Sequence, residues 1–222
     1  MDFIMKETIM RSNSMDILMK ETIKLIYAAK SNDIHGVRSA IKNKADVNMS
    51  NDRAIRHAVD NCNLLMVKTL FYSGADIHTS NEYCLRRACE NSDLETVEFL
   101  LSVGAKIHAK DDYCLKCSVE MNNLEMLDFL IKNGANFRAE DNYAIKKSVE
   151  YGYYDIVKKL IDYGANVNNS LLRIAFKNGH HNIVQLLIDH GADINTIDDN
   201  LIRSAMENKH DELIDILEKN RY

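Results

Sequence analysis

Residues 179–195 read GHHNIVQLLIDHGADIN, and this stretch decides the fold because its Gly-Ala pair recurs along the chain. The glycines of these pairs are Gly74, Gly104, Gly134, Gly164 and Gly191. Successive pairs are separated by 30, 30, 30 and 27 residues, and five of the eight glycines of the chain stand at this position. A fixed period of this length is the sequence signature of a repeat architecture.

Each repeat is predicted to form two short helices, at residues 54–61 and 64–72 in the second repeat. Apolar residues in 64–72 follow the spacing of one helix face. The glycine after this helix stands where a left-handed residue ends a helix without steric penalty. A small residue precedes each glycine by sixteen positions, at Ala58, Ala88, Ser118, Ser148 and Ala175. A single helix pair cannot bury its own apolar face, so the repeats are expected to stack.

The quoted stretch resembles the ankyrin motif G-H-x-x-I-V-x-x-L-L-x-x-G-A-D-V-N, and residues 152–168 match it almost as closely. The resemblance covers about residues 20–222. It implies an all-α ankyrin-repeat solenoid of about seven helix-turn-helix units. The units are expected to end near Ala45, Ala75, Ala105, Ala135, Ala165 and Ala192 and at the C-terminus.

The chain departs from the ankyrin motif in ways that affect the connections between repeats. The period is 30 residues rather than about 33, and the T-P-L-H element is absent. We therefore expect short hairpin fingers between the repeats. The overall style resembles the large ankyrin families of giant DNA viruses, which implies an intracellular location, in the cytoplasm of the host cell.

Two domains are expected: an N-terminal lead of residues 1–14 and an ankyrin-repeat domain of residues 15–222. Residues 1–9 recur as residues 15–23 with seven of nine positions identical. The second copy leads into the first, capping repeat. The first copy is expected to be either frayed or a short helix. It is interpreted either as a dispensable start or as an amphipathic partner-binding segment.

Composition and charge favour an ordinary globular protein inside the cell. Of the 222 residues, 46% are hydrophobic and 27% charged, so global disorder is not expected. A net charge of −5 argues against a nucleic-acid partner. Without a long apolar run or a secretory signal pattern, no membrane partner is expected. The five cysteines are an odd number, which indicates a reducing compartment rather than a disulfide framework.

One cation per repeat stands on the first helix, at Arg56, Arg86, Lys116, Lys146, Arg173 and Arg203. Four residues later come Asp60, Glu90, Glu120, Glu150, Lys177 and Glu207. One interpretation is a ladder of ion pairs, each contributing about 0.2–0.5 kcal/mol. The other is a polar groove for a charged partner, because the resemblance implies that the first helices line the concave face. Arg173 and Lys177 break the alternation, so the sixth repeat is expected to be locally basic.

A row of tyrosines, Tyr83, Tyr113 and Tyr143, stands just before the first helices. These rings either stack between neighbouring fingers and shield the helix start, or serve as exposed anchors for a partner. Tyr154 takes the position that leucines hold in earlier repeats, so it is predicted to lie in the core.

Tyr151 and Met121 are the residues most strongly predicted to contact a partner. They align with Asn61 and Asn91, at positions expected to face the groove. Tyrosine and methionine are enriched in the cores of protein interfaces. The full predicted partner-binding set is Arg86, Tyr113, Lys116, Met121, Tyr143, Lys146, Tyr151, Arg173 and Lys177.

No catalytic, cofactor or metal site is predicted. Cys114 and Cys117 supply only two ligands, whereas structural zinc needs four. The sequence contains no glycine-rich phosphate loop. It also contains no arrangement of nucleophile, base and acid that stands apart from the repeat pattern. By resemblance, Asn168 and Asn195 could be substrates of asparaginyl hydroxylation.

The sequence therefore predicts a monomeric, non-catalytic scaffold for a protein partner. The alternative is an adaptor that brings a target to the host ubiquitin and degradation machinery. Such adaptors are expected to carry a C-terminal F-box-like segment, whereas this sequence ends at Tyr222, inside the last repeat.

Overall fold

A computed structural model describes the backbone of residues 2–220 and the side chains of residues 15–220. This part of the chain forms fourteen α-helices and one 3₁₀ helix, with no strand, which confirms the predicted all-α fold. The chain divides into two compact units, Met1–Lys110 and Asp111–Tyr222. They are called the N-terminal half and the C-terminal half below, and each is described by itself.

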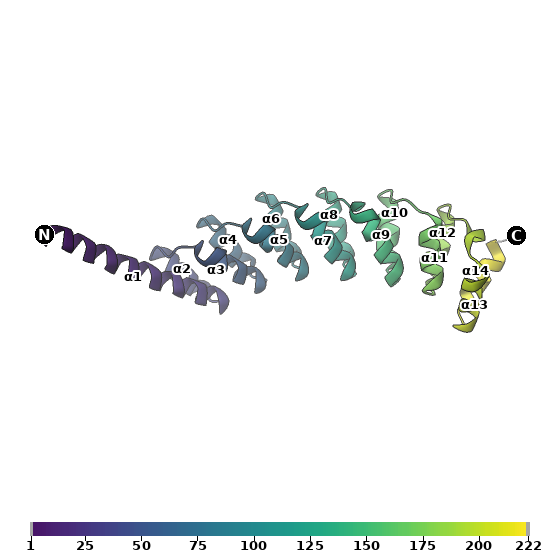
Figure 1. Cartoon of the computed structure of the whole chain (residues 1–222), viewed down its shortest axis with the longest axis horizontal. Helices are drawn as coiled ribbons and strands as arrows, with labels where there is room; N and C mark the ends of the chain where they lie inside the picture. Colours follow the sequence, from purple (N-terminus) through teal and green to yellow (C-terminus); the bar gives the residue numbers. More distant parts are fainter. Residues whose placement is uncertain (1, 221–222) are drawn as a thin grey trace. The chain divides into compact units, whose positions relative to one another are not determined.

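The helices of the N-terminal half form three pairs in chain order (Figure 1). Their bounds are α1 Asp2–Lys30, α2 Ile34–Lys42, α3 Met49–Asp60, α4 Leu64–Tyr72, α5 Thr79–Glu90 and α6 Leu94–Ser102. The first helix of each pair packs on the first helix of the next, α1 on α3 and α3 on α5. The second helices stack in the same way, α2 on α4 and α4 on α6, which is the predicted stacking of repeats.

The C-terminal half continues the same pattern. Its helices are α7 Ala109–Glu120, α8 Leu124–Lys132, α9 Ala139–Tyr151, α10 Tyr154–Asp162, α11 Asn169–Lys177, α12 His181–Asp189, η1 Ile194–Thr196, α13 Asp199–Glu207 and α14 Asp211–Asn220. The first helices α9, α11 and α13 pack in sequence, and so do the second helices α8, α10, α12 and α14. The predicted helix at residues 64–72 matches α4 at both ends.

The positions that repeat in the sequence form the core. The small residues Ala58, Ala88, Ser118, Ser148 and Ala175 are all buried, at no more than 1% exposure. The leucines of the second helices, Leu70, Leu100, Leu130, Leu160 and Leu187, are fully buried. Gly74 and Gly191 have φ values of +97° and +93°, so the repeated glycine is the left-handed residue that ends each second helix.

Three consecutive left-handed residues begin the first helix in four successive repeats. They are Ser50–Asp52, Ser80–Glu82, Lys110–Asp112 and Glu140–Asn142, with φ between 49° and 62°. A left-handed conformation costs about 1–2 kcal/mol for most residues, and Asn and Asp tolerate it best. Seven of these twelve residues are Asn or Asp. This left-handed turn lies directly before the positions Arg53, Tyr83, Tyr113 and Tyr143, where the sequence lacks the T-P-L-H element.

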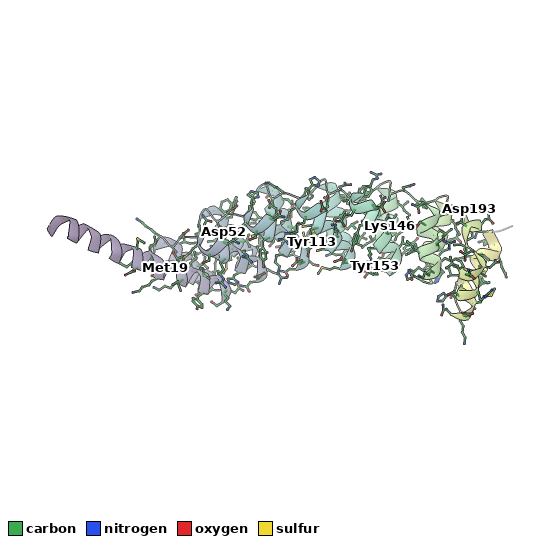
Figure 2. All side chains as sticks on the ribbon, viewed as in Figure 1. Met19, Asp52, Tyr113, Lys146, Tyr153 and Asp193 are labelled. Atoms are coloured by element: carbon green, nitrogen blue, oxygen red, sulfur yellow. The ribbon has the colours of Figure 1, made fainter. Side chains whose placement is uncertain are left out.

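In two of the four repeats, the last residue of the left-handed turn accepts a hydrogen bond from a backbone amide that follows the second helix of that repeat. Asp52 Oδ1 accepts a hydrogen bond from the Asp76 amide at 3.1 Å, and Asp112 Oδ1 accepts one from the Asn136 amide at 2.9 Å. Both carboxylates are buried, at 6% exposure, and Asp52 lies at the start of α3 (Figure 2). The Asp76 amide also donates to Asn48 Oδ1 at 3.0 Å. These bonds offset part of the cost of the turn.

The first helix, α1, runs without interruption from Asp2 to Lys30. Its residues Leu25 and Ala29 are fully buried, and α1 packs against α2 and α3, so it forms the first helix of the capping repeat. The predicted boundary between a lead of residues 1–14 and the repeat domain stays a prediction, because the side chains of this lead lie outside the described residues.

Candidate functional site

Tyr151 and Met121 lie at the ends of two first helices in the C-terminal half. Tyr151 is the last residue of α9 and Met121 follows α7 directly. Their exposed fractions are 44% and 49%, so both present large apolar side chains to solvent. The Tyr151 ring is flanked by the Tyr153 ring at 5.5 Å and by Lys147 Nζ at 5.4 Å, which limits its freedom. Their contact with a partner stays a prediction.

Tyr154 corrects one expectation. It begins α10 and is 38% exposed, whereas the sequence alignment of the repeats predicted a core position. The aligned Leu64 and Leu124 are themselves only half-buried. The first residue of a second helix therefore borders solvent, and an aromatic ring at this position reaches beyond the core.

The row of tyrosines is half-buried and engaged within the fold. Tyr83 donates a hydrogen bond to Asp60 Oδ1 at 3.0 Å, and Tyr143 donates one to Glu120 Oε1 at 2.7 Å. Burial, and then these carboxylate bonds, raise the pKa of both hydroxyls above the usual value. Tyr113 is half-buried at the corresponding position of α7 (Figure 2). These contacts favour the interpretation that the rings join neighbouring repeats.

Three central members of the cation row bind residues of the left-handed turns, some within one helix and some across repeats, as a ladder of intrahelical and inter-repeat ion pairs would. Lys116 pairs with Glu140 of the next repeat, and Lys146 pairs with Asp141 at the start of its own helix. Arg86 donates hydrogen bonds to the carbonyls of the turn residues Ser80 and Asn81, at 3.1 and 3.0 Å. A cation four residues before an acid is the weaker order on a helix, and the turn offers nearer acceptors.

The acids predicted to close these pairs have other partners. Asp60 accepts from Arg87 Nε of the next repeat at 2.9 Å, and Glu150 pairs with Lys147 at 2.8 Å, three residues before it. The ion pairs therefore also involve Arg87 and Lys147, one residue after the predicted row. Some of these ion pairs join neighbouring repeats, and others join residues of one helix.

The sixth repeat is less basic than predicted. Arg173 donates to Asp198 Oδ2 at 2.6 Å and to the Thr196 carbonyl at 2.7 Å, so its charge is compensated by the next repeat. The bond from Arg173 lowers the pKa of Asp198. Lys177, at the end of α11, is exposed.

A pocket of about 350 Å³ lies in the N-terminal half, where the sequence indicated no site. Residues of α1 and α3 line it, including Lys30 and Arg53. Both residues break the repeat: Lys30 stands at the position of Asp60 and Glu90, and Arg53 at the position of Tyr83. The pocket could have been suspected by comparing Lys30 and Arg53 with the residues at equivalent positions of the next repeats. The regular spacing of apolar residues does not indicate it.

The cysteines divide into one exposed thiol, Cys62, and four buried thiols, Cys84, Cys89, Cys114 and Cys117. Burial raises the pKa of Cys84 to about 12. Within residues 15–220, no three His, Cys, Asp or Glu side chains come together as a metal site would require.

We expect a thiol reagent to modify one cysteine in the native protein and all five after unfolding, because buried thiols are shielded from the reagent. Mass spectrometry after brief treatment with iodoacetamide at mildly alkaline pH would count the labels, and Cys62→Ser is the control that should label at none. Rapid labelling of a second cysteine in the native protein would contradict the burial of these residues.

In the part of the chain that the structure describes, no helix has both the length and the apolar character needed to cross a membrane.

Comparison with known proteins identifies the repeat. A family model described as ankyrin repeats (3 copies) matches residues 85–170 and 147–221, which is more than half of the chain. A second, described as ankyrin repeats (many copies), matches residues 55–101. The human ASB11 ankyrin repeat domain is 23% identical, with a TM-score of 0.65 over 79% of this chain and 87% of that one. No curated protein matches. The chain belongs to the ankyrin-repeat family.

Proposed function

We propose that this chain is a non-catalytic scaffold that holds a protein partner on the concave face of its stacked repeats, with Tyr151 and Met121 at the contact. Ankyrin repeats in general mediate protein–protein interactions, and proteins built from them are in general scaffolds rather than enzymes. The observation that carries the placement is the exposure of these two large apolar side chains at equivalent helix ends of adjacent repeats. Exposed to water, these two side chains contribute no free energy of apolar burial. Buried against a partner, their apolar surface would stabilise the complex.

The polar surroundings of Tyr151 suit such a contact. Lys147 lies over the ring and pairs with Glu150 at 2.8 Å, so charged groups border an apolar centre. Interfaces commonly combine an apolar centre with a polar rim. Lys146, Tyr143 and Lys116 already have partners within the fold, so we assign them to the rim. The charges of Arg86 and Arg173 are likewise engaged, and Lys177 is an exposed cation.

The double substitution Tyr151→Ala/Met121→Ala tests the placement. We expect it to weaken partner capture at least about tenfold, because exposed interface anchors contribute about 2 kcal/mol or more. The chain, captured from native cells on beads, would be compared with the variant by quantitative mass spectrometry. Circular dichroism should show unchanged helix content, because both side chains lie outside the core.

A matched control removes the same atoms elsewhere. Tyr72 and Met206 are 75% and 58% exposed, and Tyr72→Ala/Met206→Ala should retain the captured partner. Equal capture by wild type and Tyr151→Ala/Met121→Ala would contradict the proposed contact. Equal loss in both double variants would show that the effect is not local.

The finer parts of the proposal follow from the resemblance. They are membership of the ankyrin families of giant DNA viruses, an intracellular and cytoplasmic location, and a monomeric state. The alternative is an adaptor that delivers its bound partner to ubiquitin machinery. Co-purification of ubiquitin-ligase subunits with the wild-type chain would favour the adaptor, and light scattering after gel filtration would measure the mass of the free chain.

A further inference from the structure

The pocket between α1 and α3 carries concentrated positive charge. Lys30 and Arg53 line the pocket of about 350 Å³, and Arg53 and Arg56 line an adjoining pocket of about 310 Å³. Within the described residues, none of these three cations forms an ion pair, since the nearby Asp60 is taken by Arg87 at 2.9 Å. This local excess of cations contrasts with the net charge of −5 of the whole chain.

Two further observations support an incoming anion at this place. Arg56 lies with its Cζ 4.2 Å from the centroid of the Tyr83 ring, and its buried Nε has no hydrogen-bond partner within the described part of the chain. His57, which lines both pockets, has a lowered pKa because of burial and then the positive charges of Arg53, Lys30 and Arg56, against an opposing effect of Asp60. A carboxylate bound here would accept a hydrogen bond from Arg56 Nε. It would also reduce the repulsion among the three cations.

The α1 wall of the pocket also carries apolar residues, which continue along the helix. Ile23, Ile26 and Tyr27 line the wall. Met15, Met19, Ile23 and Tyr27 follow one another at four-residue intervals, with exposed fractions of 71%, 48%, 44% and 67%. Residues spaced by four are neighbours on the surface of a helix, and Met19 lies on α1 just before the helix reaches the stack (Figure 2). An exposed apolar stripe therefore leads into the cationic pocket.

The geometry points to a binding site for an acidic linear peptide, whose apolar side chains lie along the stripe of Met15, Met19, Ile23 and Tyr27 and whose carboxylates meet Lys30, Arg53 and Arg56. The apolar stripe favours a peptide over a nucleic acid, because nucleic-acid binding rests on many phosphate contacts. Three cations suit one or two carboxylates. The site is separate from the proposed contact at Tyr151 and Met121, which lies in the C-terminal half.

The repeat itself supplies a variant that should remove the site and keep the fold. Other repeats carry Glu90 or Glu120 where Lys30 stands, and Tyr83 or Tyr143 where Arg53 stands. Lys30→Glu/Arg53→Tyr therefore installs residues that this chain already accommodates at equivalent positions. Lys158→Glu/Arg203→Tyr makes the same charge change at two exposed positions of the C-terminal half and is the matched control.

The experiment is a selection from a random peptide library displayed on phage against the full wild-type chain. We expect enrichment of Asp or Glu beside Leu, Ile, Phe or Met. The most enriched peptide, labelled with fluorescein, should bind with an affinity that falls as salt rises. In anisotropy titrations, affinity should fall by about tenfold or more with Lys30→Glu/Arg53→Tyr. It should be unchanged with the matched control and with Tyr151→Ala/Met121→Ala.

Several outcomes would overturn the inference. Selected peptides without enriched acids, or equal peptide binding by Lys30→Glu/Arg53→Tyr and wild type, would contradict the charge argument. Tighter binding of a labelled oligothymidine than of any selected peptide, lost in this variant, would identify a nucleic-acid site. A self-association seen by sedimentation that the same variant abolishes would assign the surface to a second copy of the chain.

Discussion

Replacement of Leu130 by alanine is expected to lower the free energy of unfolding by about 2–5 kcal/mol. Leu130 is fully buried on α8, with Leu127 and Met126 beside it at no more than 1% exposure. The loss combines the removal of apolar surface from water with the cavity that remains. Urea denaturation followed by circular dichroism would measure it as a lower midpoint.

The control substitution is Leu65→Ala, because Leu65 lies at the exposed side of a second helix and is 54% exposed. It loses the same atoms from the same kind of helix, and a change below about 0.5 kcal/mol is expected. A loss at Leu65 as large as the loss at Leu130 would contradict the assignment of the core.

The Leu130 substitution should also act locally. Repeats contact only their neighbours, so stability is close to a sum of repeat and interface contributions. We expect hydrogen exchange to accelerate most in α8 and in α10, which packs against it. Uniform acceleration over both halves of the chain would show that the whole array unfolds as one unit.

The second helices and the core could be predicted from the sequence because two physical requirements determine them. A helix face must be apolar at a spacing near 3.6 residues, and a left-handed end requires glycine. The bounds of α4 and the burial of Leu70 and Ala58 follow from these two requirements alone.

The left-handed turns could not be predicted, because side-chain periodicity does not reveal the sign of φ. Their signal was composition: Asn51, Asp52 and Asn81 belong to the residue types that tolerate this conformation. The exact partner of each cation could not be predicted for a related reason. Whether Lys116 reaches Glu120 or Glu140 depends on where the next repeat places its turn, and spacing along one helix does not contain that information.

Tyr151 and Met121 could be identified from the sequence as unusual residues, whereas the pocket at Lys30 and Arg53 could not. The first was found because helix ends at equivalent positions share one environment, so an unusual side chain there stands out. The pocket was not found because it depends on Lys30 and Arg53, two side chains that differ from those at the equivalent positions of later repeats. These two cations lie on α1 and α3, and the spacing of residues along one helix does not show that both line one pocket.

Replacement of Gly152 by asparagine is expected to destabilise the chain by about 1–3 kcal/mol, through a clash rather than through backbone strain. A Cβ at Gly152 would lie 2.7 Å from His180 Cε1. The His180 ring is held in place, since its Nε2 lies 3.0 Å from the Glu150 carbonyl oxygen. At Gly191, with a similar positive φ, a Cβ would meet nothing within 4 Å, so Gly191→Asn should cost clearly less.

The first two repeats of the chain indicate how to relieve this clash. At the positions of Gly152 and His180 they carry Asn32 and Asn63, joined by a hydrogen bond of 2.7 Å. Asn32 has a φ of +60°, so asparagine accepts this backbone, and the side chain of Asn63 caps α4 by accepting from the Met66 amide at 2.9 Å. The double substitution Gly152→Asn/His180→Asn copies this arrangement.

We therefore expect Gly152→Asn/His180→Asn to recover most of the stability that Gly152→Asn loses. His180→Asn alone should be nearly neutral, because the lost bond to Glu150 is replaced by a side-chain cap on α12, which His180 does not supply. The coupling between the two substitutions, measured by urea denaturation of all four proteins, should favour the double variant by about 1 kcal/mol or more. Additive effects would show that backbone strain at Gly152, and not the fit of His180 against it, decides which residue each repeat can carry there.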